Sequence, residues 1–188
     1  MSERPILFSA PMVNAILAGQ KTMTRRVVNG EALKWLTPDT FPPAFVADWN
    51  GLCPYGVPGD LLWVREAFMP RPGFERVSRP HYRADDDRPE WRGLWKPSIH
   101  MPRWASRITL RVTDVRVERV QEITEGDAVR EGVQAIPEAP ASLTDRTAFA
   151  SLWDSLNAKR GHGWDVNPWV WVVSFERAAP TPESQEEG

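Results

Sequence analysis

The residues 105–120, ASRITLRVTDVRVERV, show the clearest alternation of apolar and polar side chains in the chain. Successive side chains of a β-strand point to opposite faces, so the pattern predicts a long strand with one buried face. The apolar positions change parity between Val112 and Val115, across Thr113 and Asp114. A slip of one residue predicts a β-bulge at this point, which bends a strand as a small barrel requires.

The rest of the pattern predicts short strands and few helices. Further strands are expected at 5–9, 21–28, 61–68 and 169–175, with a short one at 81–83, and helices at 10–18, 124–131 and 144–157. Gly19 and Gly132 stand where the first two helices should end, and Thr124 with Asp127 forms a capping-box pattern. Phe149, Leu152, Trp153 and Leu156 form one apolar stripe on the third helix.

Two proline-containing segments, 29–59 and 69–101, carry little helix or strand pattern and are expected to be long loop inserts. Strands and helices that do not alternate as βαβ units favour an α+β fold built on a small β-barrel. We expect one domain over 1–177. The residues 178–188 hold three Glu and two Pro and no large apolar side chain, which predicts a disordered acidic tail.

Composition excludes several classes of protein. The single cysteine, Cys53, excludes an internal disulfide, and the three scattered histidines give no metal-ligand spacing. No apolar run is long enough to span a membrane, so we expect a cytoplasmic protein, a monomer without metal or other cofactor. The net charge is −2, but residues 65–111 hold eleven Lys or Arg against six Asp or Glu. This basic region is compatible with an anionic ligand, or with an ordinary mixed surface.

Ten tryptophans are many for 188 residues, and Trp both fills cores and stacks on nucleobases. His100, Arg103, Trp104 and Arg107 lie close together in sequence, where an Arg beside a Trp suits a phosphate and a stacked base. Arg65 is grouped with them as a predicted RNA-binding residue. The alternative is that Trp104 packs under its loop.

The segment Gly19-Gln20-Lys21-Thr22-Met23-Thr24-Arg25-Arg26 resembles the signature of the ASCH domain, a PUA-like family, at Gly19, Lys21 and Arg26. Thr24 stands where many members have Glu. This departure is shared with the small ASCH proteins that act as N4-acetylcytidine amidohydrolases, whose segment also reads Lys-Thr-x-Thr. The segments 59–66, 97–107 and 167–171 are similar to a longer, phage- or prophage-associated branch of the family. The resemblance covers residues 5–177.

The resemblance implies a catalytic set of Lys21, Thr24 and Glu131, the last at the end of the helix that Ile123-Thr124-Glu125 opens. Thr24 would supply a hydroxyl, Lys21 would lower its pKa or hold an oxyanion, and Glu131 would act as a base or orient Lys21. Lys21 and Thr24 can share a pocket only if Lys21 lies in the turn after Gly19. Otherwise they are a surface Lys and a strand Thr, and Glu131 an exposed helix end.

Arg25 and Arg26 have opposite strand parity, which predicts that at most one faces the pocket. Arg26 matches the signature and is the expected ligand contact, with a plain salt bridge as the alternative.

Three functions remain open from the sequence. The first is an amidohydrolase acting on N4-acetylcytidine or a similar acylated nucleoside. The second is a non-catalytic reader of RNA or a modified base. The third is a ribonuclease, in which Lys21 assists attack by a 2′-hydroxyl. The expected partner is in each case RNA or a modified nucleoside, and fold alone does not choose among the three.

Overall fold

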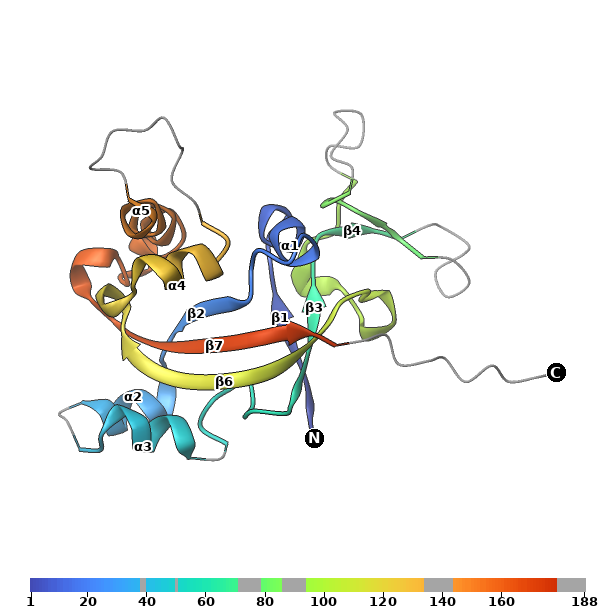
Figure 1. Ribbon diagram of the computed structural model, residues 1–188. Helices are drawn as coiled ribbons and strands as arrows, with labels where there is room; N and C mark the ends of the chain where they lie inside the picture. The colour runs from blue at the N-terminus through green and yellow to red at the C-terminus, as the bar shows by residue number, and fades with distance from the viewer. Residues whose placement is uncertain (38–39, 50, 71–78, 86–93, 134–143, 179–188) are drawn as a thin grey trace.

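The computed structural model describes residues 1–37, 40–49, 51–70, 79–85, 94–133 and 144–178 (Figure 1). The strands are β1 (Glu3–Leu7), β2 (Met23–Val27), β3 (Leu61–Arg65), β4 (Phe68–Met69), β5 (His81–Tyr82), β6 (Thr109–Arg119) and β7 (Trp169–Arg177). The α-helices are α1 (Ala10–Leu17), α2 (Gly30–Leu36), α3 (Pro43–Asp48), α4 (Glu125–Arg130) and α5 (Asp145–Asn157). Short 3₁₀ turns include η2 (Ser98–His100), η3 (Arg103–Ala105) and η5 (Ala158–Arg160).

Five strands form one sheet in the order β1-β3-β6-β7-β2, and β4 pairs with β5 in a separate ribbon. β1 and β3 are parallel, and the other pairs are antiparallel. The expected α+β class is confirmed. The long strands curve as those of a small barrel do, but β1 and β2 are edges that do not pair with each other, so among the described strands the sheet is open (Figure 1).

The predicted bulge lies on β6. The register of β6 on β7 shifts between Val112 and Asp114, where the apolar positions change parity. The extra residue lets both halves of β6 keep their apolar side chains in the core, and it adds to the bend of the strand. The parity change in the sequence therefore marks a real feature of the sheet.

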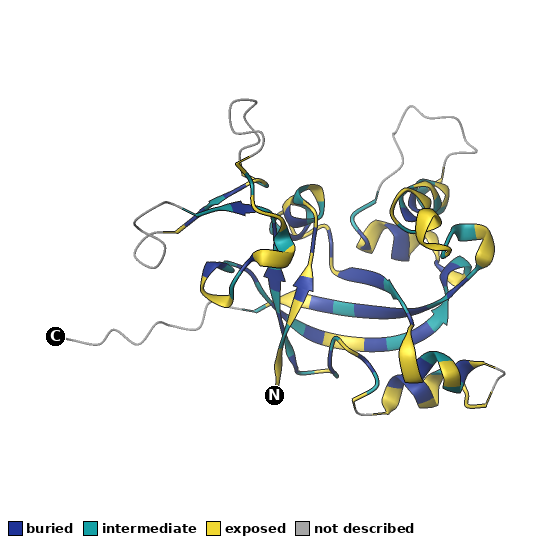
Figure 2. Ribbon diagram, turned by 180° about the vertical axis from the view of Figure 1, so that it is seen from behind, coloured by how far each residue is buried: buried dark blue, intermediate teal, exposed yellow. Residues whose placement is uncertain are grey.

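β7 is the centre of the hydrophobic core because it is buried on both faces. Trp171, Val173 and Phe175 pack into the core that α1, α2 and α3 share, whereas Val170 and Val172 pack toward α4 and α5. α4 and α5 lie over one face of the sheet and α2 and α3 over the other (Figure 1). The buried residues concentrate along these central strands (Figure 2). A strand covered on both sides needs the continuous apolar run that the sequence shows.

The predicted helices are present and begin and end close to the expected residues. Gly19 follows α1 with φ of +74°, and Gly132 follows α4 with φ of +81°. The Thr124 hydroxyl caps α4 by accepting a hydrogen bond from the backbone N–H of Asp127 at 3.1 Å. One position of the α5 stripe differs from expectation, because Leu156 is 48% exposed while Phe149 is buried.

The expectation of a loop over 29–59 was wrong, since α2 and α3 lie within it. Pro43 starts α3, where its missing N–H costs no helical bond. The helices are joined by a cluster of aromatic rings in stacked, tilted and edge-on contact, from Trp35, Phe41, Phe45 and Trp49. Val46 of α3 is fully buried in the core beneath β6. Both helices have seven residues or fewer, too short for helical periodicity to appear in the sequence.

Other boundaries differ less. The strand expected at 61–68 ends at Arg65, and the chain then starts β4 at Phe68. The short strand expected at 81–83 is β5, in the otherwise irregular second insert. The predicted tail lies outside the described residues except for Ala178, and the single domain over 1–177 stays a prediction. None of the described helices has the length and hydropathy required to cross a membrane.

Gly132 turns the chain after α4 against the first helix and Lys21. A Cβ at Gly132 would lie 3.0 Å from the Cβ of Ala15 and 3.2 Å from that of Lys21, whereas one at Gly161, with φ of +80°, would meet nothing within 4 Å. Both Gly→Ala substitutions should cost about 1–2 kcal/mol from the left-handed backbone. Gly132→Ala should cost a further ~1–3 kcal/mol from overpacking.

Urea unfolding of the two variants measures this difference. Equal losses of unfolding free energy would show that α4 does not need the close approach at Gly132.

Candidate functional site

A cavity of about 710 Å³ opens at the free edge of β2, between the start of α1 and helix α5. It is lined by Leu7, Phe8, Ser9, Met12, Lys21, Thr24, Arg25, Arg26, Val27, Asn29, Tyr55, Ser98, Glu131, Phe149, Leu152, Trp153, Leu156, Asn157, Arg160 and His162. Its size lies in the range of small-molecule sites, and its lining mixes aromatic rings with a few polar groups. We call it the β2-edge cavity.

Lys21 lies in the turn between Gly19 and β2, as sharing a pocket with Thr24 requires. The backbone N–H groups of Gln20 and Lys21 both donate to the carbonyl of Ala15, which fixes the turn to the end of α1. The Lys21 side chain is buried, and its ammonium donates to the carboxylate Oε2 of Glu131 at 2.7 Å and to its backbone carbonyl at 2.8 Å. Two of its three N–H groups are thereby used.

Thr24 lies on β2 and is 3% exposed, with its side chain on the cavity. Within the described part of the chain its hydroxyl has no hydrogen-bond partner. A hydroxyl that lines a cavity without a protein partner is available to a ligand. The structure therefore places Lys21, Thr24 and Glu131 at one cavity, and their catalytic roles stay a prediction.

Burial lowers the pKa of Lys21 from the ordinary lysine value, because the charged ammonium loses water. The Glu131 carboxylate opposes this shift, and the nearby cations Arg26 and Arg25 add to it. The lowered pKa makes a neutral amine accessible nearer to neutral pH than for a lysine in water. A lysine in this state can accept a proton from a neighbouring group.

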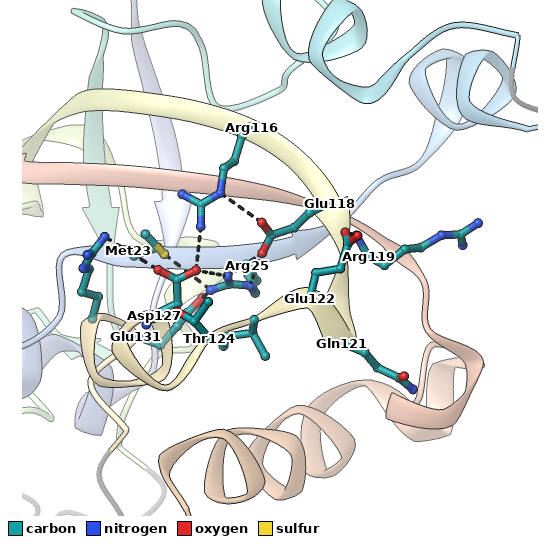
Figure 3. A network of polar contacts seen from close by, with 12 residues as sticks. Met23, Arg25, Arg116, Glu118, Arg119, Gln121, Glu122, Thr124, Asp127 and Glu131 are labelled. Atoms are coloured by element: carbon teal, nitrogen blue, oxygen red, sulfur yellow. Dashed lines mark hydrogen bonds and ion pairs between the residues drawn. The ribbon is translucent and has the colours of Figure 1, made fainter.

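Glu131 is shared between two cations. Its Oε2 holds Lys21, while Arg25 Nη1 donates to its Oε1 at 3.3 Å. The guanidinium of Arg25 is fully buried and also contacts Glu118 at 2.5 Å and Asp127 at 2.8 Å (Figure 3). Both oxygens of the carboxylate are engaged in holding cations, so this arrangement favours an orienting role for Glu131 over that of a base.

Behind Arg25 the network continues to the protein surface. Arg116 donates to Asp127 at 2.7 Å and to Glu118 at 3.0 Å, so that both carboxylates bridge two guanidinium groups (Figure 3). Each buried charge therefore has an opposite charge and hydrogen bonds, which is the condition for holding charges out of water. This network fixes α4, and with it Glu131, relative to β2 and β6.

Arg25 was missed from the sequence, because strand parity predicted that at most one of Arg25 and Arg26 reaches the pocket. Both line the cavity. β2 is an edge strand, so side chains from its two faces reach the same space around the unpaired edge. Strand parity separates the side chains of a central strand into two spaces, but it does not do so at this edge.

The unpaired edge also presents main-chain groups. Phe175 donates to the carbonyl of Thr22, and Val28 donates to the carbonyl of Trp169. In an antiparallel ladder these bonds place the N–H and C=O of Thr24 and Arg26 toward β7, and those of Arg25 away from it. The backbone of Arg25 is therefore available at the edge that borders the cavity.

Arg26 makes no salt bridge among the described residues. Its Nη2 donates to the carbonyl of Leu7 at 2.6 Å, and its guanidinium lies over the ring of Phe8 at 5.3 Å. Its Nε is buried without a hydrogen-bond partner in the described structure. Arg26 therefore has one donor that no described group satisfies.

The second predicted cluster does not reach the β2-edge cavity. His100 and Trp104 line a separate cavity of about 550 Å³, together with Phe68, Pro70, Lys96 and Pro102. Trp104 is 47% exposed, so it does not pack under its loop. The η2 turn connects the two regions, because Ser98 lines the first cavity and His100 the second.

The three remaining predicted arginines are engaged by the protein and line neither cavity. Arg103 pairs with Glu3 at 2.6 Å, and Arg65 donates to the carbonyl of Ile99. Arg107 pairs with Glu66 at 2.9 Å and lies 3.9 Å from the ring of Tyr82. Burial raises the pKa of Glu66, and Arg107 opposes that shift. Their RNA-binding role stays a prediction.

Several lining residues gave no signal in the sequence. Tyr55 comes from the first insert. Asn157 is the last residue of α5, and Arg160 and His162 follow it. The residues after α5 are held near the cavity because the Trp153 indole N–H donates to the carbonyl of His162 at 2.8 Å. A contact of this kind depends on the tertiary packing of α5, which no local pattern encodes.

No known family model matches the chain, and no curated protein matches it. Solved structures with some similarity include a protein of Enterococcus faecalis V583 described under the family-model DUF984, at 10% identity and a TM-score of 0.45, covering 95% of this chain and 81% of that one. An ASCH domain from Lactobacillus crispatus JV V101 has 14% identity and a TM-score of 0.42, covering 94% and 79%. The hypothetical protein PH0355 has 10% identity and a TM-score of 0.41, covering 94% and 99%. Likenesses at this level assign neither a family nor a function to the chain.

Replacing Glu131 with Gln should leave the buried Lys21 ammonium without its nearest carboxylate. Breaking one side of a buried pair costs about 3–5 kcal/mol of unfolding free energy. The pKa of Lys21 should fall further. Between the folded and unfolded pKa the unfolded chain binds the extra proton, so the stability deficit should shrink as pH rises toward the ordinary lysine value of about 10.4.

Chemical denaturation at several pH values measures both effects. Glu31→Gln is the matched control, because its pair with Lys34, at 3.2 Å, is exposed to solvent and should contribute little to stability. A loss for Glu131→Gln as small as the control's would show that Lys21 is hydrated rather than paired.

Proposed function

We propose that the β2-edge cavity binds a nucleoside, alone or within RNA, and that Thr24, Lys21 and Glu131 hydrolyse an acyl amide on its base, as in N4-acetylcytidine. The observation that carries this proposal is the unpaired Thr24 hydroxyl in the same cavity as a desolvated lysine. The proposal agrees with the resemblance of the Lys-Thr-x-Thr segment to ASCH amidohydrolases. On this proposal, the chain is a PUA-like ASCH protein.

The cavity suits a nucleoside in size and lining. Phe8, Tyr55, Phe149 and Trp153 contribute aromatic rings to it, and such rings stack on bases of any sequence. The Arg25 backbone at the β2 edge offers a donor and an acceptor side by side. The hydrogen-bonding edge of a base presents donors and acceptors in the same way.

The chemistry follows from the three side chains. Neutral Lys21 accepts the Thr24 proton as the hydroxyl oxygen attacks the acyl carbon, and the tetrahedral intermediate carries the negative charge on the former carbonyl oxygen. The C–N bond then breaks, and the leaving amine takes the proton from the Lys21 ammonium. Water then attacks the Thr24 ester and gives up a proton to Lys21. The bond between the acyl carbon and the Thr24 oxygen breaks, and that oxygen takes the proton back from Lys21, which releases the carboxylic acid and restores the Thr24 hydroxyl and the neutral amine. Glu131 holds Lys21 in place throughout.

Thr24→Ala should lower kcat/KM for N4-acetylcytidine by about a hundredfold or more, since the variant has no hydroxyl at the position of the proposed nucleophile. Thr24→Ser should keep measurable turnover. Thr22→Ala is the matched control, because Thr22 lies in the same segment but is exposed and does not line the cavity. Acetyl loss followed by mass spectrometry gives the rates, and undiminished turnover by Thr24→Ala would reject the proposed role of Thr24.

The rate should also depend on the charge of Lys21. If neutral Lys21 is the base, kcat/KM should rise with pH, with a midpoint below the ordinary lysine pKa of about 10.4. Lys21→Arg should lose this rise, since an arginine stays protonated. A wild-type rate that is flat with pH would assign Lys21 to charge stabilisation instead.

Two other functions give different outcomes in the same assays. A reader of RNA would bind with a steep salt dependence and release no acetate. A ribonuclease would cleave RNA and leave a 2′-deoxy substrate intact, because the attacking group is the 2′-hydroxyl. The unpaired Thr24 hydroxyl favours the hydrolase over both.

A further inference from the structure

The β2-edge cavity is unusually cationic for a chain with a net charge of −2. Of the described residues that line it, Lys21, Arg25, Arg26 and Arg160 are cations, and Glu131 is the sole carboxylate. A cavity with an excess of one charge attracts a ligand of the opposite charge.

The excess charge is not carried by Lys21 or Arg25. Glu131 neutralises Lys21, and three carboxylates surround Arg25. The two remaining cations have no carboxylate within ion-pair distance in the described structure. Arg26 donates only to the neutral carbonyl of Leu7, and Arg160 has no partner among the described residues.

Unused donors accompany this charge. The guanidinium of Arg160 is exposed and makes no hydrogen bond within the described structure, so two of its N–H groups can bind an anion together. His162, two residues further on, lines the same cavity and is half-buried.

The position of Arg160 is set by the fold. It ends η5 directly after α5, and Gly161 turns the chain with φ of +80°. His162 is tied back to α5 because its N–H donates to the carbonyl of Asn157 at 3.2 Å and its carbonyl accepts from the indole of Trp153. Arg160 and His162 therefore line the cavity from a turn that is hydrogen-bonded to α5.

We infer that Arg160 and His162 form a phosphate subsite, so that the ligand of the cavity is a nucleotide or an RNA phosphodiester rather than a free nucleoside. Guanidinium groups match the geometry of phosphate oxygens and bind them with charge-assisted hydrogen bonds. The inference rests on the proposed function for the nucleoside part. The phosphate part stands on the cationic lining alone.

The test measures the affinities of cytidine, cytidine 5′-monophosphate and ribose 5-phosphate by calorimetry, since none of them carries an acyl group to hydrolyse. Wild type should bind the monophosphate about tenfold tighter than cytidine, the gain expected of one charge-assisted contact. Arg160→Gln should bring the two affinities close together. Lys159→Gln removes the same charge from the same turn but outside the cavity lining, and it should keep the full preference.

The outcomes separate this inference from the proposed function. Equal affinities of wild type for cytidine and its monophosphate would overturn the phosphate subsite and leave the nucleoside proposal standing. Binding of ribose 5-phosphate that Arg160→Gln weakens, with none of cytidine, would support the subsite and reject the nucleoside proposal. If Arg160→Gln and Lys159→Gln both lost the preference for the monophosphate over cytidine, the subsite would be overturned, because the affinity would then depend only on the net charge.

A dinucleotide with a phosphodiester tests the source of the phosphate. If it binds more tightly than the monophosphate and depends on Arg160, the phosphate belongs to RNA. If the monophosphate binds more tightly, the ligand is a free nucleotide.

Discussion

The site depends on a buried ammonium, that of Lys21, which the fold removes from water and pairs with Glu131. Burying a charge costs several kcal/mol unless it is paired and fully hydrogen-bonded. Arg25 meets the same requirement through Glu118, Asp127 and Glu131 together. The turn after Gly19, strand β2 and helix α4 must therefore lie in their observed positions, because any other arrangement would leave one of these charges without a partner.

The position of β2 at the edge of the sheet turns this ionic core into a cavity. A central strand would have both neighbours hydrogen-bonded and would separate the side chains of its two faces. At the edge, Thr24 and Arg26 from one face and Arg25 from the other border the same space, and α5 closes it from the side. The curvature of β6, which its bulge at Asp114 increases, belongs to the same arrangement, since β6 carries Arg116 and Glu118 to the buried side of Arg25.

The cations that line the cavity are of two kinds, those paired with carboxylates and those without a carboxylate partner in the described structure. Lys21 and Arg25 are each matched by carboxylates, and burial lowers the pKa of Lys21, which suits the control of a proton. Arg26 and Arg160 line the cavity without a carboxylate partner in the described structure, which suits an anion held through its oxygens. This division explains how an acidic chain can hold an anionic ligand.

The sequence by itself determined the local features: the β6 strand with its bulge and the helix caps at Thr124 and Gly132. Each follows from backbone preferences and side-chain alternation over a few residues. Only the tertiary structure decided that Arg25 is buried beside Glu131, that α2 and α3 form in the first insert, and that Arg160 reaches the cavity. Those outcomes depend on contacts between segments far apart in the chain, such as Arg25 and Glu131, which are 106 residues apart, and such contacts leave no periodic trace in the sequence.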